Sequence, residues 1–164
     1  MKPHEIVKLK FEPALKECRL HEHRLDYALG QLTGKFPLTA ENWKNIDDET
    51  IADIDQLLFR YNKLQDAMGQ RLFPAILMAA GEFQDDQSFI DKLDRLEKIR
   101  AIPSAERWHE IRRIRNQMTH EYPDSPEQNA KNLNRVVHSI AELKKTLAQA
   151  ASYGESLASR LRLN

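Results

Sequence analysis

One long amphipathic stretch constrains the fold of this chain more than any other feature. Across residues 51–77, apolar side chains recur at every third or fourth position, and most residues between them are polar or charged. This spacing gathers the apolar side chains on one face of an α-helix. Because a helix with one apolar face is stabilised mainly by what packs against that face, the stretch predicts a bundle of helices.

The same periodicity continues along the rest of the chain. We predict an all-α, up-and-down bundle of about five helices in a single domain covering residues 1–164. Pro74 should kink or break the second helix near its end. A connector over residues 35–48 holds at most a short helical turn. The expected helices cover residues 12–32, a second to about residue 80 after a cap at Asp47 or Asp48, a third beginning at Asp85 or Ser88, 105–121 after a Ser104 cap, and 126–163 after a Ser125 cap.

Composition narrows the function classes. The 25 basic and 25 acidic residues leave no net field to attract a polyanion, so any nucleic-acid site must be local. Cys18 is the one cysteine, which excludes an intramolecular disulfide. The longest apolar run, residues 73–80, is far shorter than the ~20 residues of a spanning helix, and we see no secretory leader. We therefore expect a soluble cytoplasmic protein with no membrane contact.

The segment RNQMTHEY, residues 115–122, combines groups that suit RNA cleavage without a metal or cofactor. His120 could move a proton near neutral pH, and Arg115 could hold phosphoryl oxygens as charge builds on them. Asn116, one helical turn before His120, could fix its ring by a hydrogen bond. Taken alone, an arginine and a histidine near a helix C-terminus more often mark a solvated helix end.

Geometry complicates the catalytic interpretation. If helix four reaches residue 121, Arg115 and His120 are separated by five residues, or roughly 140° around the helix axis. They can act on one phosphate only if the arginine bends round or a second copy of the helix contributes. A two-fold homodimer would supply that second copy.

The segment resembles the R-N-x-x-x-H-x-Y signature of the HEPN superfamily, in particular of HepT-like toxins that pair with an MntA-type minimal nucleotidyltransferase. The stretches LLFRYNKLQDAMGQRLFPAIL and IPSAERWHEIRRIR are also similar to the middle helices of that family. The resemblance implies a small helical bundle in which the motif stands before the last helix, and a homodimer whose two motifs meet in one cleft.

The same resemblance implies roles for single residues. Arg115 and His120 would be the catalytic pair of a metal-independent ribonuclease, with Asn116 in support. Tyr122 would be the site where the partner nucleotidyltransferase attaches AMP to silence the toxin. A tyrosine packed over the turn before Pro123 is an equally good reading of Tyr122.

A local excess of positive charge precedes the motif. Residues 92–115 hold eight Lys and Arg against four Asp and Glu, and Arg112 and Arg113 are candidates for contacts to an RNA backbone. Such a run is more often the solvated face of an amphipathic helix. His21 and His23 are too close to share a helical face and lack a third ligand at a recognisable spacing, so we expect no metal site.

Three functions remain open at this point. The first is a ribonuclease toxin, which needs both Arg115 and His120. The second is a non-catalytic subunit that binds nucleotide or substrate and docks a nucleotidyltransferase, a role that should survive the loss of His120. The third is a plain helical interaction module in which the motif is accidental. The chain lacks a glycine-rich phosphate loop, so we do not expect it to transfer nucleotides itself.

Overall fold

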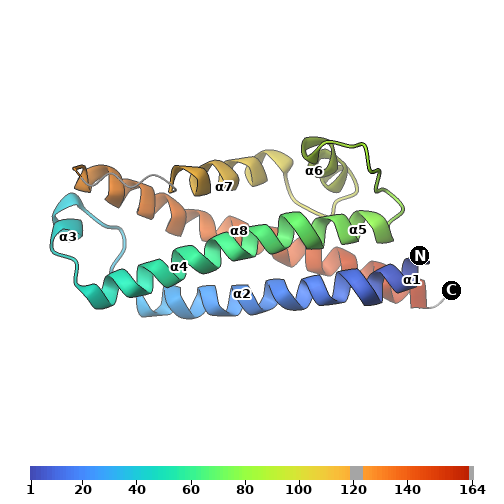
Figure 1. Ribbon diagram of the computed structural model, residues 1–164, viewed down its shortest axis with the longest axis horizontal. Coiled ribbons are helices and arrows are strands. Elements are labelled where there is room, and N and C mark those ends of the chain that lie inside the picture. The colour runs from blue at the N-terminus through green and yellow to red at the C-terminus, as the bar shows by residue number, and fades with distance from the viewer. Residues whose placement is uncertain (119–123, 163–164) are drawn as a thin grey trace.

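The computed structural model describes residues 1–118 and 124–162, and the regular structure in these ranges is helical (Figure 1). Two five-residue π-helical turns lie within the long helices. The elements in chain order are α1 (Pro3–Ile6), η1 (Val7–Phe11), α2 (Glu12–Gln31), α3 (Ala40–Lys44), α4 (Asp48–Ala67), η2 (Met68–Leu72), α5 (Phe73–Ala79), α6 (Phe89–Lys98), α7 (Ala105–Gln117) and α8 (Pro126–Arg162).

The long helices alternate in direction, which confirms the predicted all-α bundle. α1, η1 and α2 form one continuous helix, and α4, η2 and α5 form a second that returns antiparallel to it (Figure 1). α6 and α7 lead back again, and α8 spans the length of the bundle, so both chain ends lie at the same end of the molecule (Figure 1). α3 is the short turn expected in the connector, where the Phe36–Pro37 peptide bond is cis.

Helix starts follow the capping residues read from the sequence. The side chain of Asp47 accepts a hydrogen bond from the Thr50 amide at 2.8 Å, and Ser88 accepts one from Asp91 at 3.1 Å. Ser104 caps α7 in the same way. These side chains satisfy amide groups that have no partner within the helix, which fixes where each helix begins.

Two predicted boundaries are wrong. The first helix begins at Pro3, well before the predicted residue 12, and α7 ends at Gln117, before the predicted residue 121. Pro13 stands inside the observed helix, where a proline lacks an amide hydrogen and its ring clashes with the carbonyl four residues earlier.

The π turns resolve that clash. η1 contains Leu9, four residues before Pro13, and η2 contains Gln70, four residues before Pro74. The wider turn shifts the hydrogen-bonding pattern next to each proline, so the helix continues beyond it. Pro74 therefore does not break the second helix, and the distortion falls on the turn before it.

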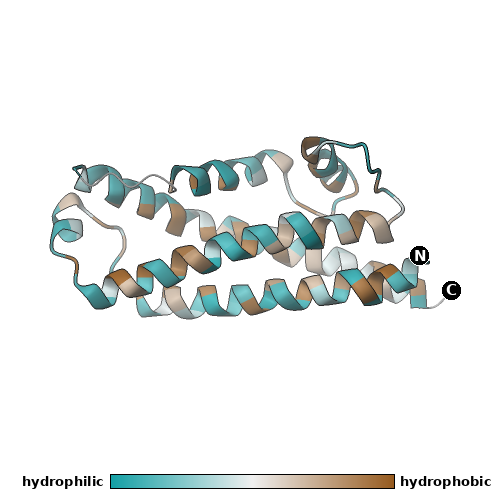
Figure 2. Cartoon of the chain, in the orientation of Figure 1, coloured by the Kyte–Doolittle hydropathy of each residue, from teal (hydrophilic) through white to brown (hydrophobic). Residues whose placement is uncertain are grey.

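The core lies along the line where the apolar faces meet. Predicted stripe residues Ile54, Leu57, Tyr61 and Leu64 of α4 are buried, and Trp108 of α7 is fully buried. Figure 2 shows apolar and polar residues in short alternating bands along the long helices, as expected when each helix buries one face. None of the helices in residues 1–118 and 124–162 has the length and apolar character needed to cross a membrane.

Gly154 marks the closest packing between α8 and the first helix. A Cβ atom at this position would lie 2.1 Å and 2.2 Å from two ring carbons of Phe11. Phe11 is itself only 2% exposed. α8 therefore has glycine here because the ring of Phe11 occupies the space of a side chain, and the helix continues through it to Arg162.

Candidate functional site

Arg115 lies in the last turn of α7, and its guanidinium group faces α4. It donates hydrogen bonds through both terminal nitrogens to the carboxylate of Asp66, and the bond from Nη2 to Oδ2 is 3.2 Å long. A further bond from Nη1 reaches the backbone carbonyl of Asn62 at 3.5 Å. With its side chain 21% exposed, Arg115 is held in a fixed orientation at the surface between the two helices.

Arg112 approaches the same carboxylate. Its Nη1 lies 3.8 Å from Oδ1 of Asp66. Two arginines therefore surround one aspartate, and the group keeps a positive charge in excess. Such a cluster can attract a phosphate, although part of the charge of Arg115 is already neutralised within the protein.

Arg113 and Asn116 lie on a different face of α7. Together with Arg112 and His109 they line an open hollow between α6 and α7, whose other side carries Asp94 and Glu97. The structure thus brings the predicted residues Arg112, Arg113 and Asn116 to one hollow, while Arg115 turns toward α4. Arg113 also pairs with Glu110 at 3.4 Å.

His120 and Tyr122, the predicted acid-base group and modification site, lie outside the described residues. So does the expected hydrogen bond between Asn116 and His120, and the angle between Arg115 and His120 stays a prediction.

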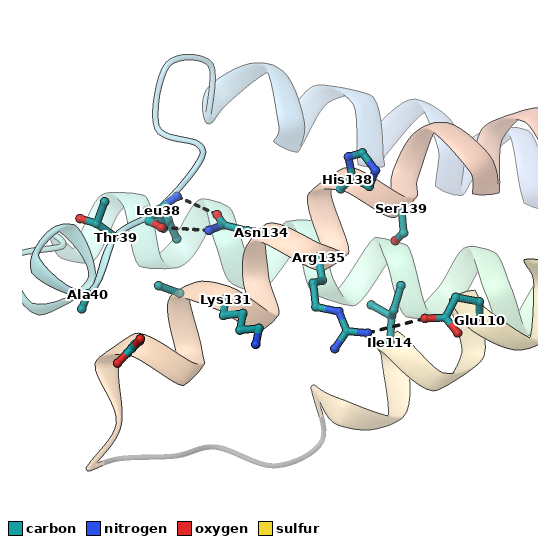
Figure 3. A pocket seen from close by; sticks show the side chains of 12 residues that line it. Leu38, Thr39, Ala40, Glu110, Ile114, Lys131, Asn134, Arg135, His138 and Ser139 are labelled. Atoms are coloured by element: carbon teal, nitrogen blue, oxygen red, sulfur yellow. Dashed lines mark hydrogen bonds and ion pairs between the residues drawn. The ribbon is translucent and has the colours of Figure 1, made fainter.

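A second hollow lies where α3, α7 and α8 meet (Figure 3). Its volume is about 600 Å³. We call it the α3–α8 hollow, and it is lined by Leu38, Thr39, Ala40, Glu110, Ile114, Glu127, Ala130, Lys131, Asn134, Arg135, His138 and Ser139. α7 and α8 are the helices on either side of residues 119–123 in the chain, so this hollow lies beside the described part of the motif.

Sequence reasoning missed the residues that surround the motif. Asp66 lies 49 positions before Arg115, and nothing in its local sequence distinguishes it from other helix-surface aspartates. Arg135 was missed in the same way, although its Nη1 donates to the Gln117 side chain, inside the motif, at 2.8 Å. Both pairings depend on how separate helices pack, a property that local periodicity does not carry.

Cys18 is not a nucleophile. It is completely buried on α2, and burial raises the pKa of its thiol to about 12, with the nearby carboxylate of Glu17 acting in the same direction. The thiol is thus protonated at neutral pH and packs as a small apolar group.

No group of three or more His, Cys, Asp and Glu side chains within residues 1–118 and 124–162 is arranged to hold a metal ion. Comparisons of the chain with protein families, with curated proteins and with solved structures each found no match. The site must therefore be interpreted from its own residues.

Proposed function

We propose that this chain is a HepT-like HEPN ribonuclease, the toxin of a pair in which an MntA-type nucleotidyltransferase is the antitoxin. The observation that carries the proposal is the placement of Arg115. The first residue of the RNQMTHEY segment, Arg115, lies in the last turn of α7, five residues before His120 in the chain, and its guanidinium group is held in place by Asp66.

In the proposed reaction, His120 takes the proton of an RNA 2′-hydroxyl. The 2′-oxygen attacks the adjacent phosphorus, and the bond from phosphorus to the 5′-oxygen of the next nucleotide breaks. The departing oxygen takes the proton from the protonated imidazole of His120, which leaves a 5′-hydroxyl and a 2′,3′-cyclic phosphate and restores neutral His120. Arg115 binds the phosphoryl oxygens as negative charge builds on them.

Asp66 serves as a positioning residue in this proposal. Two parallel hydrogen bonds restrict the rotation of a guanidinium group more than one bond does, so less conformational entropy is lost when the arginine binds phosphate. Arg112 supplies the second positive charge beside it. Asn116 is the proposed support for His120, and Arg113 is a proposed contact to the RNA backbone.

The proposal includes two partners besides RNA. A homodimer would bring the Arg115 of one copy toward the His120 of the other and so remove the angular mismatch within one helix. The cognate nucleotidyltransferase would attach AMP to Tyr122 and block the cleft. Intact-mass measurement of the chain co-expressed with its partner, with Tyr122→Phe as the control, tests the modification.

The central experiment is expression of the chain alone in a bacterial host, as wild type, His120→Ala and Arg115→Ala. We expect growth arrest and broken cellular RNA with the wild type, and neither with the two variants. Purified variants that melt like the wild type exclude unfolding as the cause. A folded wild type that leaves growth and RNA intact would contradict the proposal.

One observation favours a second candidate function. Because Asp66 neutralises part of the charge of Arg115, the motif also suits a subunit that binds nucleotide and docks a nucleotidyltransferase without cutting RNA. The His120→Ala variant should bind the nucleotidyltransferase, as measured by calorimetry, whether the chain is a ribonuclease toxin or a docking subunit. RNA cleavage by the wild type separates them, since a docking subunit has none.

A further inference from the structure

The α3–α8 hollow gives the connector over residues 35–48 a structural role. Asn134 of α8 holds the connector through two hydrogen bonds to Leu38, one accepted from the Leu38 amide at 2.7 Å and one donated to its carbonyl at 2.9 Å (Figure 3). These bonds fix Leu38, Thr39 and Ala40 as one wall of the hollow. The wall is therefore preformed, as in most small-molecule sites.

The inner surface of the hollow is apolar. Leu38, Ile114 and Ala130 line it, and each is less than one tenth exposed. An apolar surface with polar groups at its edge is the usual lining of a site for a planar ligand, which covers the apolar part and directs its polar atoms outward. The volume of about 600 Å³ is within the range of roughly 300–1,000 Å³ of such sites.

Two cations stand at the edge. Lys131 and Arg135 project from neighbouring turns of α8 (Figure 3). Lys131 has no hydrogen bond or ion pair within the described part of the chain, so its ammonium group can bind an anion. Arg135 is oriented by Glu110 at 3.6 Å and by the side chain of Gln117 at 2.8 Å.

The two acidic residues of the hollow equal its two cations in number, and Lys131 is the cation that forms no ion pair with either of them in the described part of the chain. Glu110 has its charge met by Arg113 at 3.4 Å and by Arg135 at 3.6 Å. Glu127 lies in the first turn of α8, where the helix dipole favours a carboxylate. A carboxylate at the edge also accepts hydrogen bonds from amino groups of a nucleobase.

We infer that the α3–α8 hollow holds one nucleotide of single-stranded RNA next to the cleavage position, with its base against Leu38 and Ile114 and its phosphate at Lys131 and Arg135. The inference rests on the proposed function and extends it from cleavage to base preference. The bond between Arg135 and Gln117 joins the hollow to the motif, and on this ground we place the nucleotide near the one that is cut.

The test measures where the purified homogeneous protein cuts a single-stranded RNA pool of random sequence, by sequencing the product ends. We expect one position beside the cut to show a base preference. Lys131→Ala should lower kcat/KM about tenfold, the usual size of one lost charge-assisted hydrogen bond. Ala40→Phe, which fills the hollow without removing a charge, should abolish the base preference.

Lys145→Ala is the matched control, because Lys145 is an exposed lysine of the same helix outside the hollow. It should leave both kcat/KM and base preference unchanged. Thermal melting of each variant checks its fold, and light scattering checks its oligomeric state.

The outcomes separate the inference from the function on which it rests. Cleavage by the wild type with Lys131→Ala and Ala40→Phe unchanged would overturn the inference and leave the ribonuclease standing. No cleavage by the folded wild type would overturn both. A change in oligomeric state in both hollow variants would show a contact between protein copies, and the inference would then be wrong.

Discussion

The packing around α8 differs between the two ends of the bundle. At the end that holds both chain termini, α1, η1, α5 and the last turns of α8 pack together, and the ring of Phe11 leaves no room for a Cβ at Gly154. At the motif end, formed by α3, the last turn of α7 and the first turns of α8, the same chain leaves the α3–α8 hollow open.

The difference predicts that the two ends respond differently to substitution. Close packing of the Phe11 ring against Gly154 allows little change at that contact without cost, although a hollow of about 370 Å³ opens beside it between the first helix and α8. The motif end instead carries charged and polar side chains around a space, and these contribute little to stability because they are partly exposed. We therefore expect substitutions to affect stability most at the terminal end and function most at the motif end.

The largest stability effect should come from Gly154→Ala. The new methyl group would overlap the ring of Phe11, and we expect the free energy of unfolding to fall by about 1–3 kcal/mol despite the better helix propensity of alanine. Gly30→Ala is the control, since nothing lies within 4 Å of a Cβ there. It should be neutral or raise the free energy of unfolding by up to about 1 kcal/mol. Urea unfolding measures both, and equal effects would contradict close packing at Gly154.

A smaller loss is expected in the buried layer beneath the hollow. The Tyr61 hydroxyl donates to Ser139 Oγ at 2.6 Å, since Ser139 itself donates to the Val136 carbonyl at 2.7 Å. Burial raises the pKa of Tyr61 to about 12, so the phenol stays neutral. Tyr61→Phe should lower the free energy of unfolding by about 1 kcal/mol in urea unfolding. A loss equal to that of a cavity-forming substitution would mean that the layer is packed differently.

At the motif end, the pair between Arg115 and Asp66 should contribute less to stability than to orientation. A double-mutant cycle with Arg115→Ala and Asp66→Ala should give a coupling free energy below about 1 kcal/mol, as for other partly exposed ion pairs. RNA cleavage by Asp66→Ala should nevertheless fall strongly. A large coupling free energy together with unchanged RNA cleavage would contradict the role of Asp66 as a positioning residue.

The smallest expected effect is the pH dependence of stability that comes from His21 of α2. Burial lowers its pKa from the ordinary 6.5, Arg60 acts in the same direction, and Glu17 opposes them. The unfolded chain therefore binds more protons below pH 6.5, so stability is full above that pH and falls as the pH drops toward the folded pKa. His21→Gln should flatten this part of the curve of melting temperature against pH. A variant curve as steep as that of the wild type would assign the effect to other groups.

The sequence contained the local features of the fold but not the contacts between distant helices. Asp47, Ser88 and Ser104 act on amides three positions away, so their capping roles could be read directly. The pairing of Arg115 with Asp66 and the fixing of Leu38 by Asn134 join segments far apart in the chain, and they depend on the rotation of each helix in the bundle. The first helix begins before Pro13 because the π turn at Val7–Phe11 accommodates the proline, a distortion that the spacing of apolar residues does not predict.

The two π turns also change how the sequence must be numbered against other helical proteins. Each turn holds residues in excess of the α-helical count, and one residue corresponds to about 100° of rotation around a helix. A continuous heptad count along residues 3–31 or 48–79 therefore loses phase at Val7–Phe11 and again at Met68–Leu72. Any alignment of this chain to a straight-helix template must treat the residues before and after each π turn as separately phased blocks, with a one-residue gap allowed between them.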